Sequence, residues 1–474
     1  MSFSTNSTAA SPFTDTLAPF LQADGLPFAD VLTAADIDQA GAELGVTFGQ
    51  TSRSFWTPAL TLWTFLSQVL DASPSCRAAV ARAWVAVALC RPPQDVDTGN
   101  YCRARAKLPA VLLQRLALQV GQRLEQAVPA TWLWHGHHSH LIDGFTVSLP
   151  DTAENQQQYP QPNTQQPGLG FPLVRVVAML SLATAAVQGL AYGPYQGKES
   201  GETALFRTLL DQLSAGDIVV ADRYYCSYFL VALLQAWGVD VVLRLHQGRR
   251  CDLRRGRRLG PNDHVVVWRK PQRPDWMAEE TYAALPASLE VREIRQQLTT
   301  PGCRVETLHV VTTLLDAEEY PPEEIADLYH QRWHVELDIR SLKITLKMEE
   351  LRCLTPFMVE KELWAHVLAY NLVRKVAAQA ALPRGMSPRQ ISFAASQQLV
   401  LAAWSKLTEA TAAERLRLAA GLLVVLGKEQ VGHRPGRCEP RAKKRRPKKG
   451  KLLMKPRAVA RAELLAGRNP EAAA

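Results

Sequence analysis

Hydrophobic positions recur with two different periods along this chain. Between residues 25 and 134 apolar residues recur every three to four positions, and Thr57-Pro58 and Pro109 mark two helix starts. From residue 140 to 245, short apolar runs bounded by turn residues predict the order strand, strand, strand, helix, strand, helix, strand. We therefore expect an α/β fold with a mixed-sheet core, preceded by an all-helical N-terminal domain.

The remainder of the chain adds an insertion and a helical end. Residues 246–304 combine a basic turn with segments that alternate like antiparallel strands, which predicts a β-rich insertion. Helical spacing returns after residue 320 and continues to about residue 407. The boundaries we predict are 1–24 for a flexible N-terminus, 25–134 for a helical domain that binds DNA, 135–245 and 305–356 for the two parts of the core, 246–304 for the insertion, 357–433 for C-terminal helices and 434–474 for a basic, disordered tail.

Segment 325–347 has the spacing of one continuous helix with an unusual polar stripe. At about 100° per residue, six polar residues fall within about 80° of one another. They are Tyr329, Arg332, Glu336, Arg340, Lys343 and Lys347. Apolar residues flank the stripe on both sides: Leu328, Ile339 and Leu346 on one shoulder, Trp333, Leu337 and Ile344 on the other. Gln331, His334 and Asp338 lie on the opposite face.

A carboxylate among cations, between two apolar walls, is costly to bury without compensation. A metal ion beside Glu336 and a polyanion over the cations would compensate, so the stripe favours a site that binds both. The alternative is a charged, solvated helix face whose periodicity is accidental.

Two aspartates occupy strand positions that can supply partners for Glu336. Asp143 lies within the first apolar strand, and Asp222 ends the fourth. The strand order allows these two strands to be neighbours, with catalytic groups at the strand ends. Asp151 is a rival to Asp143, but it follows Pro150 at a loop. Mg²⁺ prefers oxygen ligands such as carboxylates, which this chain would supply from separate elements. Two Mg²⁺ ions about 3.5–4 Å apart support phosphoryl transfer on nucleic acid.

Positive charge is concentrated near the C-terminus. The net charge is +9, while segment 434–457 alone holds 12 Lys and Arg residues and one acid. Such a run indicates an arm that binds polyanions, the alternative being a tail that only improves solubility. Arg103, Arg105 and Lys107 form a second basic cluster that suits DNA contact, although the same helices would suit any helical domain.

Cysteine and histidine residues give weaker indications. The eight cysteines include no CxxC pair, which disfavours a zinc ribbon. His135, His137, His138 and His140 lie in HGHHSH without an interleaved Cys or carboxylate, so we do not assign them a metal. The N-terminus lacks the pattern of a signal peptide, and the apolar segment 173–192 predicts paired strands instead of a membrane span. We expect a cytoplasmic, nucleoid-associated protein.

The motif Y-x2-R-x3-E-x6-K, met by Tyr329, Arg332, Glu336 and Lys343, resembles the signature of the DDE transposases of bacterial insertion sequences, in the branch named for Tyr-Arg-Glu-Lys. The segment IDGFTVSLPDT resembles the first-Asp segment of this branch, with Phe145 as a departure, and VVADRYYCSYFL resembles the second. The basic tail is similar as well, so the resemblance covers roughly residues 50–458.

This resemblance implies an RNase H-like core in which Asp143, Asp222 and Glu336 are the catalytic metal ligands. It implies two Mg²⁺ ions, which Mn²⁺ can replace, and DNA contacts from Tyr329, Arg332 and Lys343. The enzyme would pair the terminal inverted repeats of its element in a synaptic homodimer, expose a 3′-OH at each end and join these ends to target DNA. Related enzymes pass through hairpinned ends, but the sequence leaves the route of second-strand cleavage open. Arg223, Arg340 and Lys347 are our own additions to the DNA contacts.

Two other functions remain possible from the sequence. A nuclease on the same core would stop at hydrolysis, and a decayed copy would bind element ends without cutting them. The presence of all three carboxylates disfavours the decayed copy.

Overall fold

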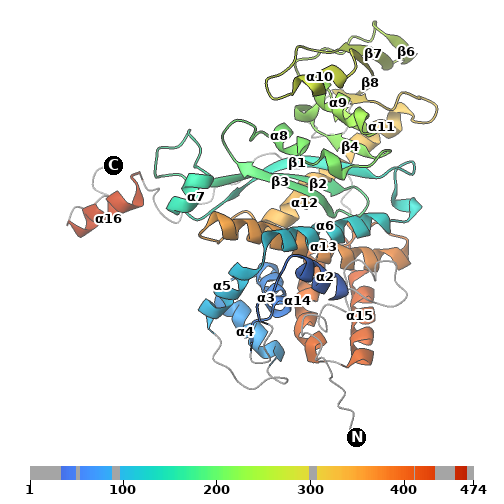
Figure 1. Ribbon diagram of the computed structural model, residues 1–474. Coiled ribbons are helices and arrows are strands. Elements are labelled where there is room, and N and C mark those ends of the chain that lie inside the picture. The colour runs from blue at the N-terminus through green and yellow to red at the C-terminus, as the bar shows by residue number, and fades with distance from the viewer. Residues whose placement is uncertain are drawn as a thin grey trace.

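A mixed β-sheet lies at the centre of the computed structural model (Figure 1), which describes residues 34–49, 54–87, 97–297, 307–409, 411–432 and 454–466. Within these residues nine strands form one sheet in the order β3-β2-β1-β4-β5-β9-β8-β7-β6. The strands are β1 (Ser139–Ser148), β2 (Leu173–Ser181), β3 (Val187–Pro194), β4 (Ile218–Ala221), β5 (Asp240–Arg244), β6 (Arg257–Gly260), β7 (Asp263–Arg269), β8 (Ser288–Gln297) and β9 (Thr307–Thr312). The α/β fold predicted from the sequence is confirmed.

Pairing in the sheet changes direction around β1. Strand β1 is antiparallel to β2 and parallel to β4, and β4 is parallel to β5. Strands β9, β8, β7 and β6 then follow β5 in antiparallel order. The strands of segment 246–304 therefore extend the central sheet through the β8–β9 pair, and they project at the top of Figure 1.

Helices cover both faces of the sheet. Because successive residues of β1 point to opposite faces, Leu141 belongs to a core shared with α6 and α13, whereas Ile142 belongs to a core shared with α8 and α9. The helix bounds are α2 (Ala34–Glu43), α3 (Pro58–Leu70), α4 (Cys76–Val87), α5 (Thr98–Lys107), α6 (Ala110–Gln126), α7 (Ala153–Gln158), α8 (Glu202–Arg207), α9 (Tyr228–Ala236), α10 (Glu279–Ala284), α11 (Pro322–His330), α12 (Trp333–Arg340), α13 (Pro356–Ala381), α14 (Phe393–Glu409), α15 (Ala412–Leu426) and α16 (Arg457–Leu465).

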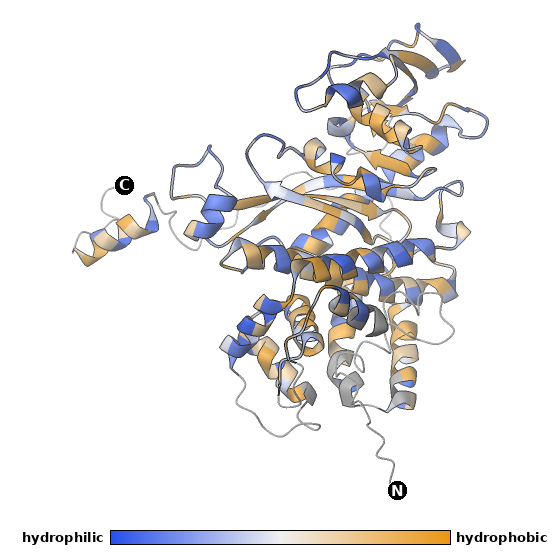
Figure 2. Cartoon of the chain, in the orientation of Figure 1, coloured by the Kyte–Doolittle hydropathy of each residue, from blue (hydrophilic) through white to orange (hydrophobic). Residues whose placement is uncertain are grey.

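Helix α13 lies between the sheet and the lower helices (Figure 1), and it carries both hydrophobic and hydrophilic residues (Figure 2). Most of its side chains are buried. It packs against α6, α3 and α14, so the N-terminal helices and the sheet share one hydrophobic core. Burial from all sides explains why its apolar residues are distributed around the helix instead of forming a single stripe. No helix in the described part of the chain is both long and apolar enough to be a membrane span.

Local signals placed several helices correctly. The hydroxyl of Thr57 accepts a hydrogen bond from the Leu60 amide at 3.2 Å, and Pro58 occupies the first helical position of α3. Helix α5 was not predicted, although Asp97 caps it by accepting a hydrogen bond from the Asn100 amide. Helix α16 lies inside the segment that we expected to be a disordered tail, while residues 434–453 and 1–24 lie outside the described residues.

The expectation of one continuous helix over 325–347 was wrong. Helix α11 ends at His330, α12 begins at Trp333, a π-helical turn spans Ser341–Thr345, and Lys347 has a positive φ of 59°. Only one apolar shoulder is buried. The shoulder formed by Trp333, Leu337 and Ile344 is 58%, 42% and 54% exposed.

Buried ion pairs explain this orientation of α12. Asp338, on the face opposite the polar stripe, is buried and contacts Arg374 at 2.8 Å and Arg389 at 2.7 Å. Arg374 comes from α13, and Arg389 also donates to the carbonyl groups of Ser181 and Leu182 at the end of β2. These contacts tie the helix that carries Glu336 to α13 and to the sheet.

Candidate active site

Parallel pairing of β1 with β4 brings the two predicted aspartates together. Ile142 is the register partner of Ala221, and Asp143 and Asp222 are the next residues of the two chains. Asp143 stays in β1, where its carboxylate accepts a hydrogen bond from the Gly144 amide at 2.8 Å. Asp222 leaves β4 as the cap of a short 3₁₀ turn and accepts from the Tyr224 amide at 2.7 Å.

Arg332 connects the third carboxylate to this pair. Its guanidinium donates to Glu336 Oε1 at 2.7 Å, and its Nη1 lies 3.6 Å from Asp143 Oδ2. Arg332 can reach both because it lies at the break between α11 and α12, and α12 packs beside β1. One guanidinium thus contacts carboxylates from a strand and from a helix that are distant in the sequence.

Asp143 is held in a partly buried position close to other carboxylates. The pKa of Asp143 is raised to about 6, mainly by burial. The carboxylates of Asp222 and Glu202 also raise it, while the Gly144 amide and Arg332 lower it. Clustered carboxylates that disfavour their own ionisation are suited to bind a cation. Since the ligands offered are carboxylate oxygens, the donor set fits a hard divalent ion.

Glu202 is a neighbour of these acids that the sequence analysis missed. It begins α8, and a Cβ atom added to Gly144 would lie 2.3 Å from the Glu202 Cδ atom. Burial raises the pKa of Glu202, and Asp222 raises it further while Arg175 lowers it. The sequence signal was an acid at the start of an apolar helix (GETALF), which is also what any helix N-terminus shows.

Cations and a tyrosine border the carboxylates. Tyr329 is buried, and its pKa is raised by burial while Arg332 and Arg244 lower it. Arg244, at the end of β5, was not predicted from the sequence, and its pKa is lowered by burial and by the proximity of Arg223. Arg223 also contacts Gln247 Oε1 at 3.4 Å. Arg223, Arg244 and Arg332 therefore form a cationic rim beside the carboxylates.

The other predicted cations lie elsewhere. Lys343 is 3.3 Å from Glu349, and Lys347 donates to the Ala72 carbonyl group in the N-terminal helical region. Lys347 therefore does not continue the stripe of Glu336, since the chain leaves the straight helix before it. Arg340 is exposed at the end of α12.

The basic cluster of α5 is divided between surface and core. Arg103 and Lys107 are exposed, whereas Arg105 is buried over the rings of Phe65 and Tyr101. We had expected all three to face outward. In a helix, however, residues two apart lie about 200° apart and cannot share a face.

Other polar residues singled out in the sequence have separate structural partners. Asp151 is exposed and bonded to Gln156 at 2.8 Å, away from the aspartate pair. The four histidines of HGHHSH each have a different partner. His135 contacts Glu324, His137 contacts Tyr320 and the Gly216 carbonyl, His138 contacts Glu125, and His140 contacts Asp217.

The chain is similar in sequence to known transposases. A model of the transposase DDE domain matches residues 136–372. The transposase InsG of insertion sequence IS4 from Escherichia coli K12 is 28% identical over 353 residues, which are 72% of this chain and 75% of that protein. The transposase of insertion sequence IS421 from Escherichia coli is 34% identical over 64 residues, 14% of this chain and 17% of that protein.

Among solved structures, a piggyBac transposase in a synaptic complex with hairpin DNA aligns with a TM-score of 0.43 and 10% identity over 90% of this chain and 88% of that chain. The family match covers the strands and helices that carry the three carboxylates. The chain belongs to the DDE transposase family of insertion sequences related to IS4, and it is a DNA transposase that cleaves DNA with divalent metal ions.

Proposed function

We propose that Asp143, Asp222 and Glu336 hold the metal ions of this transposase and that the physiological ion is Mg²⁺, which Mn²⁺ can replace. The observation that carries the proposal is the single guanidinium of Arg332 in contact with both Asp143 and Glu336, beside the register neighbour Asp222. When bound, the metal ions supply Lewis acidity at the reacting phosphodiester and lower the pKa of the attacking hydroxyl group. Arg332 supplies positive charge between the carboxylates and orients Glu336.

The strand order supports an RNase H-like core. Three antiparallel strands, β3-β2-β1, are followed by the parallel strands β4 and β5, and the acids lie in β1, after β4 and on a later helix. We assign this core to 135–245 and 305–356, the insertion to 246–304 and a DNA-binding role to the helices before residue 134. These are the boundaries expected from the sequence.

The cationic rim supports a DNA path across the site. Arg223, Arg244 and Arg332 would contact the phosphates on either side of the reacting one, because guanidinium groups suit bidentate binding of phosphate. Tyr329, Arg332, Glu336 and Lys343 complete the Tyr-Arg-Glu-Lys pattern, so we infer that second-strand cleavage uses hairpinned ends. Arg103, Lys107, Arg340 and Lys347 remain proposed contacts with the DNA of the terminal inverted repeats or the target, in a synaptic homodimer.

The deciding experiment uses the DNA that flanks the gene. Purified protein is incubated with a duplex that carries the flanking inverted repeats, with Mg²⁺ and a supercoiled target. We expect 3′-OH nicks, hairpinned ends and products joined to the target. Nicks without joined products would favour the hydrolytic endonuclease, and binding without nicks would favour the decayed copy.

Metal affinity should depend on pH through Asp143. The folded-state pKa is raised to about 6, above the ordinary value of 3.8, so the folded protein binds this proton more tightly than the unfolded chain. Asp143 thus favours folding at pH below about 4, and this contribution is lost as pH rises through about 6. Metal binding must displace the proton, so we expect Mn²⁺ affinity to weaken by about tenfold for each pH unit below about 6, measured by calorimetry.

A control variant separates the pH dependence of metal binding from acid-induced unfolding. Replacing Asp143 by Asn should remove the pH dependence together with most of the affinity, while circular dichroism shows a folded protein across the same range. An affinity that stays constant from pH 7 to pH 5 would contradict the assignment of Asp143 as a ligand.

Glu202→Gln should weaken metal binding while leaving the fold intact. Removing a negative charge beside Asp143 reduces the attraction for a cation, and residues that support metal ligands typically change affinity by about 10- to 100-fold. Mn²⁺ titration by calorimetry measures the change. The matched control is Glu199→Gln, since Glu199 pairs at the surface with Arg207 and precedes the same helix. Equal affinities in the two variants would remove Glu202 from the site.

A further inference from the structure

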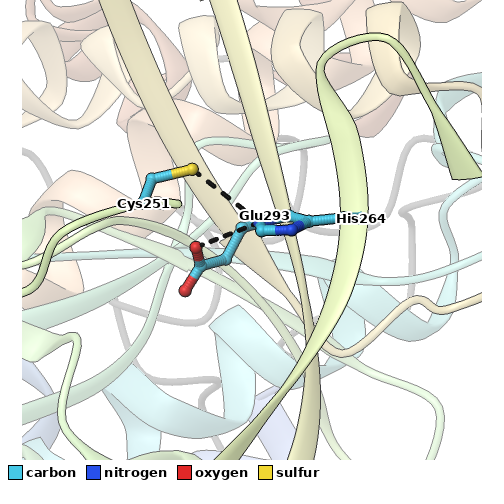
Figure 3. A group of neighbouring side chains, drawn as sticks. All are labelled: Cys251, His264 and Glu293. Carbon is cyan, nitrogen blue, oxygen red and sulfur yellow. Dashed lines mark hydrogen bonds and ion pairs between the residues drawn. The ribbon is translucent and has the colours of Figure 1, made fainter. Parts of the chain in front are cut away.

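A second group of potential metal ligands lies in the insertion. Cys251 comes from the loop before β6, His264 from β7 and Glu293 from β8 (Figure 3). His264 and Glu293 are register partners across the β7–β8 pair, so their side chains share one face of the sheet. The ligand atoms of the three residues all lie within 4.8 Å of one another.

The spacing of these atoms matches a tetrahedral metal site. The distance from Cys251 Sγ to His264 Nε2 is 3.8 Å, and that from Nε2 to Glu293 Oε2 is 3.3 Å. Metal–ligand bonds of about 2.0–2.3 Å in tetrahedral geometry separate the ligand atoms by about 3.3–3.7 Å. A metal ion could therefore enter between these side chains after small adjustments of their positions.

The orientation of His264 is also that of a metal ligand. Its Nδ1 lies 2.7 Å from the Arg255 carbonyl oxygen, which can only accept, so Nδ1 carries the proton. In the neutral ring Nε2 then presents a lone pair toward Cys251 and Glu293. Glu293 is held in turn by the indole N–H of Trp268, which donates to Oε1 at 3.3 Å. Metal-bound histidines commonly donate the other ring N–H in this way, and ligating carboxylates are commonly hydrogen-bonded.

A catalytic thiol does not explain this arrangement. A Cys-His-Glu relay needs the thiol on one ring nitrogen and the carboxylate on the other. Here both face Nε2, while the backbone occupies Nδ1. A metal-free cluster with a protonated His264 paired to Glu293 is the remaining alternative.

We propose that Cys251, His264 and Glu293 bind one Zn²⁺ ion, with water as the fourth ligand. Sulfur, nitrogen and oxygen together are a donor set that zinc accepts and that Mg²⁺, with its preference for oxygen, does not. Binding replaces the S–H bond of Cys251 by a sulfur–zinc bond, and the proton passes to the buffer. The site is chemically distinct from the carboxylate cluster around Asp143.

The ion would fasten a basic loop to the sheet. The loop between β5 and β6 carries Cys251 together with Arg254 and Arg255, whose side chains are 91% and 84% exposed. Arg249, from the same loop, stacks 3.8 Å from the centre of the Trp268 ring. If the insertion contacts DNA, zinc holds these arginines in position for phosphates, a consequence that rests on the proposed function.

Cobalt substitution tests the site in the full-length protein. Tetrahedral Co²⁺ bound to a thiolate gives visible absorption and a sulfur-to-metal charge-transfer band, which oxygen ligands around Asp143 cannot give. We expect one zinc per chain after dialysis with excess Mg²⁺, and a charge-transfer band that is lost in Cys251→Ser. The control is Cys353→Ser, which removes a thiol outside the proposed site and should keep both. A missing thiolate band in the native chain, or the same band in Cys251→Ser, would overturn the proposal.

Two further measurements do not depend on the cysteine variant. Trp268→Phe keeps the aromatic packing but removes the donor to Glu293, and zinc affinity should fall about tenfold. Zinc at about 100 times its dissociation constant should slow tryptic cleavage after Arg254 and Arg255 by about 100-fold if opening of the loop requires release of the ion. Unprotected cleavage at this zinc concentration would contradict ligation of the ion by Cys251, and unchanged zinc affinity in Trp268→Phe would contradict ligation by Glu293 in the orientation that Trp268 holds.

The DNA consequence is measured separately. If zinc binds as expected but does not change the affinity of the chain for inverted-repeat DNA, the metal site stands and the role of the loop in DNA binding is wrong. Loss of DNA cleavage in Cys251→Ser with normal zinc content would point to the active site instead.

Discussion

Replacing Asp143 or Asp222 by Asn, or Glu336 by Gln, is expected to lower metal-dependent cleavage at the element ends by about 1,000-fold or more. Metal ions contribute several kcal/mol of charge stabilisation to phosphoryl transfer, and each 1.36 kcal/mol corresponds to about tenfold in rate. The substitutions keep the size and hydrogen-bonding shape of each side chain. Binding to inverted-repeat DNA should therefore persist, measured by gel shift beside a cleavage assay on the same duplex.

Asp151→Asn is the matched control for this series. Asp151 is eight residues after Asp143 but exposed and bonded to Gln156, so its replacement should leave cleavage within about twofold of the native rate. Substantial cleavage by any of the three variants would remove that residue from the metal site. A large loss in Asp151→Asn would instead favour Asp151 over Asp143 as the first carboxylate.

Asp338→Ala is expected to reduce the free energy of unfolding by about 3–5 kcal/mol. The substitution leaves the guanidinium groups of Arg374 and Arg389 without their carboxylate, and uncompensated buried charge costs this much. The loss arises from the unpaired cations, since replacing a whole buried ion group by apolar residues is often nearly neutral. Urea unfolding followed by circular dichroism measures the change.

The ion pair of Lys343 with the exposed Glu349 provides the comparison. Glu349→Ala removes a more solvated and longer ion pair, 3.3 Å between its charged atoms, and should cost at most about 1 kcal/mol. The triple replacement of Asp338, Arg374 and Arg389 by apolar residues of similar size should regain most of the stability lost in Asp338→Ala. A small effect of Asp338→Ala would show that water reaches the two arginines when the carboxylate is absent.

Much of the core followed from local patterns. Thr57-Pro58 predicted the start of α3 because a capping hydroxyl and a proline act within one turn. The strand order around Asp143 and Asp222 allowed their strands to be neighbours, and the structure pairs Ile142 with Ala221 beside them. The spacing of Arg332 and Glu336, four residues apart, placed both on one side of the segment, where they form an ion pair.

The pattern failed where tertiary contacts override the period of a straight helix. The spacing placed Asp338 opposite the polar stripe but could not show that it is buried there, because Arg374 and Arg389, both more than 30 residues later, provide its counter-charges. The break after His330 and the left-handed residue Lys347 end the straight geometry on which the stripe depended. Arg105 was expected at the surface because its segment was not recognised as helical.

The sequence by itself indicated the three carboxylates, Arg223 and Arg332 near them and the family to which they belong, because strand runs, helix spacing and a short motif are local properties of the chain. Tertiary structure alone revealed Glu202 beside Gly144 and the group of Cys251, His264 and Glu293. The absence of a CxxC pair argued against a zinc ribbon, but it could not address ligands drawn from a loop and two strands. The register of β7 with β8 joins residues that are 29 positions apart, and no spacing within the chain encodes that pairing.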